Sequence, residues 1–407
     1  MECGAAAKVA ALAASRSPRY ATRMNPLYEQ MKISVFERMS LAATRNGAVN
    51  LGQGFPDFGW PDALLDAAAK ALTDGSNQYA PSRGLPTLRE AVAAHYNRHF
   101  GQELSVDHVC VTSGATEALG AAILATVQPR DEVIIFTPAY DSYAPTIRRA
   151  GATPVEVALE PPDWKLDSEA IESAIGPKTR AILFNNPHNP AGKLFEAGEL
   201  ETLAAIASEH DLVVISDEVW EHVVLDGLKF TPIATMPGMA ERTIKVGSAG
   251  KIFSLTGWKV GWMVAPPGLA TIVSRAHQFL TFSTAPNLQA AVAFGLNEGD
   301  EWISPMQSRF QRARDRMTAG LREAGYSVLE ARSTYFLCVD LAASGLGLDD
   351  ATFAERAVNE TGVAVIPLSV FAEGPAPQGL VRLCFGKKDE TIDAGVAAMA
   401  KAKGMFA

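Results

Sequence analysis

Cysteine is scarce in this sequence, and the four cysteines, at positions 3, 110, 338 and 384, form no close pair. That spacing argues against a metal site or a disulfide framework, and it is typical of a protein in a reducing compartment such as the cytoplasm. Cys110 and Cys338 lie within apolar runs, so we expect both thiols to be inert core residues.

Long apolar runs and an excess of positive charge are also missing. No apolar stretch approaches the roughly 18–20 residues that a membrane-spanning helix needs. Lysine and arginine number 36 against 45 aspartates and glutamates, for a formal net charge of −9. This balance disfavours a nucleic-acid-binding protein, which usually carries a basic face. With 407 residues, 48% of them hydrophobic, the chain predicts a globular protein of two or three domains, or of one large domain with a satellite.

Residues 1–23 are rich in alanine and slightly basic, a composition that a targeting peptide can share. Their apolar stretch is short and is interrupted by Lys8, which disfavours a secretory signal. We expect a tail, or a short arm that contacts a partner subunit.

Short β-branched runs alternate with helical patterns through the middle of the chain. Strands that are apolar throughout and alternate with helices predict an α/β fold, in which helices sandwich a mostly parallel sheet. The expected strands are 108–112, 132–137, 153–158, 180–185, 212–217, 243–248 and 260–265. The expected helices include 115–126, 168–174, 196–209 and 269–279.

The pattern changes after residue 295. A long charged helix over 301–324 is followed by expected strands at 335–340, 363–367 and 380–385, with a helix at 351–360 between them. This is a smaller α+β domain, and we expect the segment before Gly54 to pack against it. The predicted divisions are an extension 1–23, a first part of the small domain 24–60, a large domain 61–295, and the rest of the small domain 296–407.

Polar residues gather after these strands, where open α/β sheets carry their functional groups. Ser113-Gly114-Ala115-Thr116 stands between a strand and a helix, so free N–H groups there can bind a phosphate. The run 185–192, with three asparagines and two prolines, can hold a side-chain amide in a fixed place. Each also has an ordinary explanation, as a capped turn or a proline-rich turn, and His188 is more typical of a structural residue.

Charged residues follow the next two strands. Asp217 closes a wholly apolar strand, and a buried carboxylate is costly unless a cation or hydrogen bonds compensate it. Lys251 and Lys259 lie in a glycine- and serine-rich segment after another strand, where one lysine can act as a nucleophile and the other can bind an anion. The alternatives are a salt bridge for Asp217 and solvated surface charges for the lysines. A phosphate-binding P-loop is excluded, because Ile252 stands where that motif needs a hydroxyl.

Six motifs in register resemble the class I aminotransferases of pyridoxal-phosphate fold type I. They are NLGQGFPDF, TSGATEAL, NNPHNPAG, SDEVW, SAGKIFSLTGWKVGW and GLVRLCFGK, and the likeness covers nearly the whole chain after residue 24. Within that class the sequence is similar to the kynurenine, methionine and bacterial succinyldiaminopimelate aminotransferases. The resemblance implies a transaminase that moves the amino group of an L-amino acid to a 2-oxo acid.

The resemblance also implies a role for each matching residue. Lys251 would form the Schiff base with pyridoxal 5'-phosphate and then act as the base, and Asp217 would pair with the protonated pyridine nitrogen. Asn189 would hydrogen-bond the ring oxygen, and Tyr140 would stack on the ring face. The phosphate would be bound by Gly114, Ala115, Thr116, Ser248 and Lys259.

Substrate and partner follow from the same resemblance. Arg382 would bind the substrate α-carboxylate as a bidentate fork, with the Gly54 backbone and Asn189 nearby. Tyr79 would reach the phosphate in the neighbouring subunit, and Phe282 would enter the neighbour's substrate pocket beside Phe36. The two residues together imply a homodimer with shared sites. Kynurenine enzymes commonly carry histidine after the Phe282 counterpart, and here it is Ser283.

One position departs from the family pattern. Asp-x-x-Tyr is usual after the pyridine-binding aspartate, and this sequence has Trp220 in place of the tyrosine. An indole N–H can only donate a hydrogen bond. Either Trp220 donates at a shifted angle, or Asn189 alone holds the ring oxygen.

Several functions compete at this stage. The aromatic lining favours apolar, aromatic, methionine-like or glutamine-like donors, while succinyldiaminopimelate or aspartate transamination and a C–S β-lyase activity remain alternatives. The aminotransferase-like domain of a transcription regulator would need an additional DNA-binding domain, and the two dozen residues before the fold are too few for one.

Overall fold

The computed structural model describes residues 24–407 except 30, 32, 299 and 375, so the predicted extension 1–23 lies outside the described residues. The chain divides into two units at residue 34. The described part of the first unit holds one short helix, α2 (Pro26–Glu29), and the second unit holds all the other described elements. No helix of the described residues is long and apolar enough to span a membrane.

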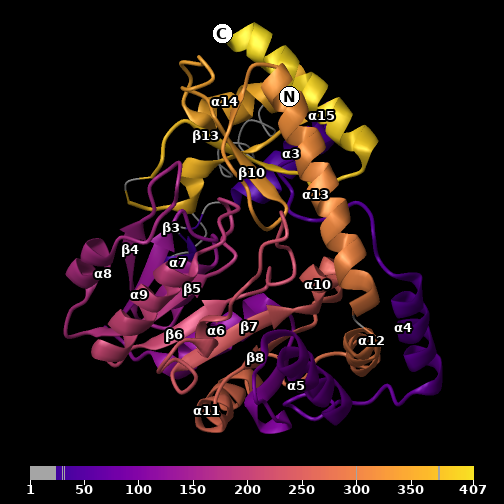
Figure 1. Ribbon diagram of the computed structural model, residues 1–407, viewed down its shortest axis with the longest axis vertical. Coiled ribbons are helices and arrows are strands. Elements are labelled where there is room, and N and C mark those ends of the chain that lie inside the picture. Colours follow the sequence, from indigo (N-terminus) through magenta and orange to yellow (C-terminus); the bar gives the residue numbers. More distant parts are fainter. Residues whose placement is uncertain (1–23, 30, 32, 299, 375) are drawn as a thin grey trace, which may run out of the picture. The chain divides into compact units, whose positions relative to one another are not determined.

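A seven-stranded sheet forms the centre of the second unit, with the strand order β2-β8-β7-β6-β5-β3-β4 (Figure 1). Its strands are β2 (Val109–Thr112), β3 (Glu132–Thr137), β4 (Thr153–Ala158), β5 (Thr179–Asn185), β6 (Val213–Asp217), β7 (Thr243–Ser248) and β8 (Gly261–Val264). All neighbours are parallel except β8, which is antiparallel to both β2 and β7. The sheet is therefore mostly parallel, as predicted, and β8 is the one reversal that the sequence pattern did not reveal.

Both faces of this sheet are covered. The evidence is that neighbouring residues of one strand, whose side chains point to opposite faces, belong to two different hydrophobic cores. Cys110 and Met263 pack into a core that includes Leu119 of helix α6, whereas Val111 and Trp262 pack into a second core. Strands buried on both faces read as continuous apolar runs, which explains why the sequence located them so well.

Helices precede, connect and follow these strands. Their bounds are α3 (Val35–Asn46), α4 (Asp62–Asp74), α5 (Pro86–Phe100), α6 (Ala115–Thr126), α7 (Tyr143–Arg149), α8 (Ser168–Ala174), α9 (Ala197–Glu209), α10 (Ala249–Ile252), α11 (Pro267–Gln278) and α12 (Pro286–Asn297). Helix α6 packs against β6, β7 and β8, and α11 packs on α6. The N-terminus of α6 is thereby fixed close to the strand ends that carry the polar residues.

A separate four-stranded antiparallel sheet follows, with the order β12-β13-β10-β9. Its strands are β9 (Ser327–Val328), β10 (Phe336–Asp340), β12 (Ile366–Pro367) and β13 (Leu380–Cys384). The helices of this region are α13 (Asp300–Glu323), α14 (Asp350–Arg356) and α15 (Asp389–Phe406), with a π-helical turn at Ala357–Thr361. Helices α13 and α15 lie alongside each other (Figure 1).

Residues 35–53, the part of the segment before Gly54 that belongs to the second unit, contact this later part of the chain. Strand β1 (Val49–Asn50) pairs in parallel with β11 (Val363–Ala364), and the Cys384 N–H donates to the Leu51 carbonyl over 2.7 Å. The expected strand 363–367 is in fact two strands, because residues 363–364 pair with β1 while residues 366–367 pair with β13. The predicted domain limits at 60 and 295 stay predictions.

Candidate active site

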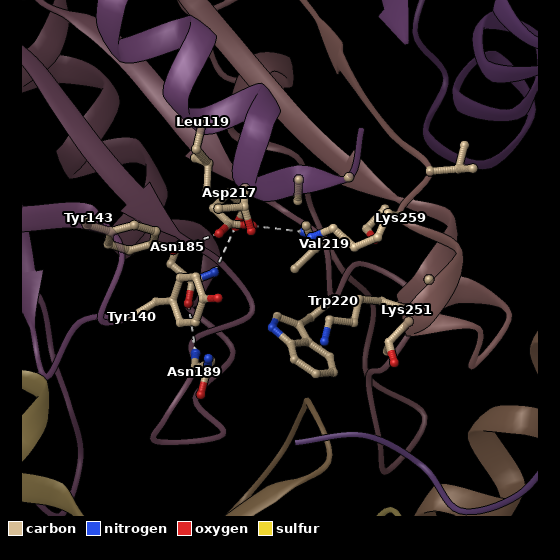
Figure 2. Close-up of a pocket in the computed structure, with 17 residues that line it drawn as sticks. Leu119, Tyr140, Tyr143, Asn185, Asn189, Asp217, Val219, Trp220, Lys251 and Lys259 are labelled. Carbon is tan, nitrogen blue, oxygen red and sulfur yellow. Dashed lines mark hydrogen bonds between the residues drawn. The ribbon is translucent and has the colours of Figure 1, made fainter. Parts of the chain in front are cut away.

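A cavity of about 230 Å³ lies where strands β2, β5, β6 and β7 end (Figure 2). Open α/β sheets place their ligand sites at this edge. Among the residues that line it are Gly114, Ala115, Thr116, Tyr140, Tyr143, Asn185, Asn189, Asp217, Trp220, Ser248, Lys251 and Lys259. The structure therefore brings together most of the residues that the sequence motifs singled out, although they span more than 140 positions of the chain.

An anion site forms at the start of helix α6. Gly114 precedes the helix with φ +80°, a conformation that favours glycine, and a Cβ there would lie 3.3 Å from the Lys259 ammonium nitrogen. Lys259 itself has a left-handed backbone conformation with φ 54°, and its side chain lies beside Gly114. The free N–H groups of the first turn and the Lys259 ammonium together suit a phosphate.

Asp217 ends strand β6 and is only 5% exposed. Its carboxylate accepts a hydrogen bond from the Tyr143 hydroxyl at 2.7 Å and a longer one from the Val219 N–H at 3.4 Å. Burial raises the pKa of Asp217 to about 6, against which these two hydrogen bonds act. Among the residues that the structure describes, the carboxylate thus meets neutral donors rather than an ion-pair partner. A cation in the cavity would relieve the cost of its burial.

Two asparagines connect Asp217 to the loop after β5. The Asn185 side-chain amide donates to the Asp217 backbone carbonyl at 2.9 Å, and its oxygen accepts from the Asn189 N–H at 2.8 Å. Asn185 therefore fixes the backbone of Asn189, which lines the cavity (Figure 2). His188 in the same loop is 1% exposed, and burial lowers its pKa to about 3, so it is a neutral packing residue.

Arg382, in the middle of β13, is 2% exposed and lies next to Asn189. Its guanidinium donates to the Asn189 side-chain oxygen at 2.9 Å and to the Gly52 carbonyl at 3.0 Å, while its Nε has no partner among the described residues. Burial lowers the pKa of Arg382 to about 10, which leaves it charged at neutral pH. The rings of Phe336, Phe36 and Phe371 surround it, with centroids 3.9, 5.1 and 5.1 Å from the guanidinium carbon.

Lys251 projects from the short helix α10 into the cavity. Its amine donates to the Tyr335 hydroxyl at 3.1 Å and lies 4.6 Å from the centroid of the Trp220 ring. Burial lowers the pKa of Lys251 to about 8, although the Asp217 carboxylate acts in the opposite direction. A substantial fraction of the amine is therefore neutral near pH 8, as a nucleophile or base requires.

Tyr335 is a site residue that the sequence reasoning missed. Its hydroxyl accepts from Lys251 and donates to the Gly54 carbonyl at 2.6 Å, and its ring meets Trp220 edge-on at 4.3 Å. No motif signals this residue, because it precedes a strand 84 positions from the lysine. Tyr143 was also missed, although its signal was available, since it stands only three residues after Tyr140 and begins helix α7.

Tyr79 and Phe282 do not line the cavity of their own chain. Tyr79 is 84% exposed and Phe282 is 42% exposed, and the two rings make an edge-to-face contact at 5.4 Å. We call this pair the aromatic arm. Gly54, Phe36 and Arg382 also lie outside the cavity lining. Arg382 is joined to it by the hydrogen bond to Asn189, and Gly54 by the Tyr335 hydroxyl that also contacts Lys251. The Phe36 ring lies beside the Arg382 guanidinium.

A second polar cluster is buried near the site. The Lys245 ammonium lies 3.0 Å from Glu218 and 2.5 Å from Glu221, while His95 and His222 approach each other at 2.8 Å through their Nε2 atoms. Atoms of His95, Glu221 and His222 lie close enough together for a metal ion to bridge them. Because Lys245 already supplies Glu221 with a cation, we interpret the cluster as a structural ion network.

The cavity residues fit a phosphorylated aromatic aldehyde with a basic ring nitrogen. The helix start and Lys259 suit its phosphate, Tyr140 offers a ring face, and the buried Asp217 carboxylate lacks the cation that a protonated ring nitrogen would supply. Lys251 offers an amine of lowered pKa for the carbonyl carbon.

Comparison with known proteins agrees with this geometry. The family model "aminotransferase class I and II" matches residues 46–399. A "Probable N-succinyldiaminopimelate aminotransferase" of Mycobacterium tuberculosis is 44% identical over 376 residues, covering 89% of this chain and 94% of its own. The solved structure of N-succinyldiaminopimelate aminotransferase from that organism has a TM-score of 0.90 at 43% identity, with coverage of 93% of this chain and 100% of the other.

Two further relatives carry other substrate names. A methionine aminotransferase of Escherichia coli is 40% identical over 374 residues, covering 90% of this chain and 97% of its own. A kynurenine–oxoglutarate transaminase of Dictyostelium discoideum is 36% identical over 398 residues, covering 88% and 92% of the two chains. The relatives thus agree on the reaction and differ in the donor.

Proposed function

The chain belongs to the class I and II aminotransferases and is a pyridoxal-phosphate-dependent transaminase, and from this premise we propose a donor class and a role for each site residue. We propose that it takes its amino group from L-amino acids with an apolar, aromatic, methionine-like or glutamine-like side chain. The observation that carries this proposal is the enclosure of Arg382 by Phe36, Phe336 and Phe371. A donor whose α-carboxylate binds Arg382 would set its side chain against these rings.

The residues that would hold the cofactor follow from the cavity. Lys259, Ser248 and the N–H groups at the start of α6 would hold its phosphate, and Asp217 would pair with its ring nitrogen. Tyr140 would cover one ring face and Asn189 would donate to the ring oxygen. Once bound, the cofactor supplies an electron sink for the charge that develops at the substrate Cα.

Lys251 would move the proton in the reaction. Its neutral amine would take a proton from the substrate Cα and return it to the cofactor carbon that carries the amino group. The pKa of about 8 suits both directions, because neither the charged nor the neutral amine is strongly favoured near that pH. Tyr335 would keep the amine oriented between these two positions, since its only proton already goes to Gly54.

Arg382 would recognise the α-carboxylate of every substrate. The guanidinium already forms hydrogen bonds with Asn189 and Gly52, so it is held in place before the substrate arrives. A donor screen tests the donor proposal directly. Each amino acid would be paired with 2-oxoglutarate or pyruvate, and preference for methionine, glutamine or aromatic donors over aspartate is the expected result.

N-succinyldiaminopimelate is a second candidate substrate, favoured by the 44% identity to the mycobacterial protein that bears its name. It belongs in the same screen, and a preference for it over all simple amino acids would replace the first proposal. Formation of pyruvate from a single amino acid, without the aminated cofactor, would indicate β-elimination instead.

We also propose that the enzyme is a cytoplasmic homodimer with shared sites. The exposed aromatic arm supports the dimer, because large aromatic side chains exposed in a pair favour a protein partner. The buried free thiols of Cys110, Cys338 and Cys384 support a reducing compartment. Mixing a Lys251→Ala subunit with a Tyr79→Ala subunit tests the sharing, because heterodimers should regain activity that neither variant has alone.

A further inference from the structure

Three segments around the phosphate site meet at one buried side chain, the imidazole of His277. This residue lies near the end of α11 and is 0% exposed. Its Nδ1 lies 2.8 Å from Glu117 Oε1 of helix α6, and its Nε2 lies 2.7 Å from the Ser82 carbonyl oxygen. The motifs did not single it out, and the proposed reaction does not use it.

The two partners of His277 decide its protonation. A carboxylate and a backbone carbonyl can only accept hydrogen bonds, so both ring nitrogens must donate. A neutral imidazole has one N–H, whereas an imidazolium has two. The geometry therefore requires the charged ring at neutral pH.

In the described part of the chain, His277 faces one carboxylate and two backbone segments. Glu117 is its charged neighbour from α6, and the segments of Ser82 and Phe282 present backbone groups. Burial acts to lower the pKa of His277, but Glu117 and these two backbone contacts outweigh it, so the pKa is raised overall. The contacts that depend on the charged ring are thus intact at low and neutral pH and are lost as the pH rises through this raised pKa.

Glu117 connects His277 to the proposed phosphate site. Its second oxygen accepts from the Ser113 N–H at 2.9 Å, directly before Gly114. The Ser113 hydroxyl lies 3.2 Å from the Thr284 hydroxyl. This contact connects the start of α6 to the turn that carries Phe282. One imidazolium thereby links the start of α6 to both segments of the aromatic arm.

The arm needs such support. Phe282 has φ +66°, a left-handed conformation that is unfavourable for a residue other than glycine. The neutral side chain of Gln289 also connects the two segments that carry Tyr79 and Phe282. It accepts a hydrogen bond from the Leu85 N–H at 2.8 Å and donates one to the Thr284 carbonyl at 2.7 Å. Loss of the His277 charge should therefore loosen the arm without unfolding it.

We propose that His277 is a positioning residue, a buried imidazolium that holds the phosphate-binding helix start and the aromatic arm in their working geometry. This inference rests on the proposed phosphate site at α6. Its consequence is that cofactor affinity falls in alkaline solution in a way that depends on His277.

The first test reads the protonation state directly. The chain has seven histidines, and ¹⁵N-histidine labelling with a His277→Gln spectrum for assignment would isolate the His277 signals in the cofactor-free and the loaded protein. We expect both nitrogens to be protonated at pH 7 and to titrate above the range of a free histidine. A single protonated nitrogen at pH 6–7 would overturn the proposal, whatever the cofactor does.

The second test measures the dissociation constant of pyridoxal 5'-phosphate from pH 6 to 10. His277→Gln keeps one donor and no charge, so we expect about tenfold weaker binding at pH 7 and the loss of one alkaline titration step. His210→Gln is the matched control, because His210 pairs with Glu172 at 2.8 Å on the surface and should bind like the wild type. An unchanged pH dependence in His277→Gln would refute the positioning role, whereas absence of cofactor binding in every protein at every pH would refute the proposed function instead.

Discussion

The charge of Asp217 should destabilise the cofactor-free protein by an amount that the structure allows to be calculated. Burial raises the pKa of Asp217 from 3.8 to about 6 in the folded chain. One pKa unit corresponds to about 1.4 kcal/mol, so the ionised carboxylate costs about 3 kcal/mol of folding free energy above pH 6. The substitution Asp217→Asn removes that charge and keeps an oxygen for the Tyr143 hydroxyl.

The sign of the pH effect follows from proton uptake. Between pH 3.8 and about 6 the folded protein holds a proton at Asp217 that the unfolded chain has lost, so stability falls as the pH rises through this window. Cofactor-free Asp217→Asn should therefore be more stable than the wild type at pH 8, by up to about 3 kcal/mol, and nearly equal to it at pH 4. Glu221, whose pKa burial also raises, contributes equally to both proteins and cancels in the comparison.

Urea unfolding of the cofactor-free proteins at pH 8 and pH 4 measures the effect. Asp226→Asn is the matched control, because the Arg314 hydrogen bond lowers the pKa of Asp226, and its loss should lower stability or leave it unchanged. Adding pyridoxal 5'-phosphate should reverse the order and stabilise the wild type more, while Asp217→Asn should lose several orders of magnitude in turnover. Equal stability of both cofactor-free proteins at pH 8, or near-normal turnover of the variant, would refute the reasoning.

Three other predictions concern neighbouring residues. Lys251→Ala should lose the cofactor absorbance band and nearly all turnover, and borohydride labelling found at Lys259 instead would contradict the assignment. Arg382→Ala should lower kcat/KM for amino acids by roughly 30-fold to several thousand-fold (about 2–5 kcal/mol) but affect amines without a carboxylate far less. Arg382→Lys should regain only part of the kcat/KM for amino acids. Equal losses for both donor classes would show that Arg382 supports the fold instead. Tyr335→Phe should lower the pKa of Lys251, because the ammonium loses a hydrogen-bond acceptor, and so move the acidic limb of the pH profile of kcat to lower pH. Tyr326→Phe is the control, since it breaks a hydrogen bond to the Met399 carbonyl elsewhere and should leave the profile unchanged.

The sequence predicted the large sheet almost strand by strand because its parallel strands are buried on both faces. Strands β3, β4 and β7 begin and end at the predicted residues. The prediction failed where a segment changes partner, as at residues 363–367, since a run of apolar residues does not reveal which sheet it joins. The sequence located β8 but not its antiparallel direction, since an apolar run does not reveal the direction of its strand either.

The site could be predicted as far as its motifs are local. Asp217 ends β6, and Lys251 lies in the short helix that follows β7, so the sequence pattern already placed both residues at this edge of the sheet. Tyr335 and His277 depend on contacts between segments that are distant in the chain, which no local pattern encodes. Trp220 was recognised as a departure, but its edge-on contact with Tyr335 emerged only in three dimensions.

The hydrogen-bonded chain from Arg382 through Asn189 and Asn185 to the Asp217 backbone limits how this enzyme can be redesigned. A designer who wants an amine transaminase would first replace Arg382, since an amine donor has no carboxylate for it to bind. That replacement also frees the Asn189 amide to rotate, and a rotated amide would present oxygen where the cofactor needs a donor. Substrate range and cofactor orientation are therefore coupled through this hydrogen bond. A library that varies positions 189 and 382 jointly should yield active variants that single substitutions miss.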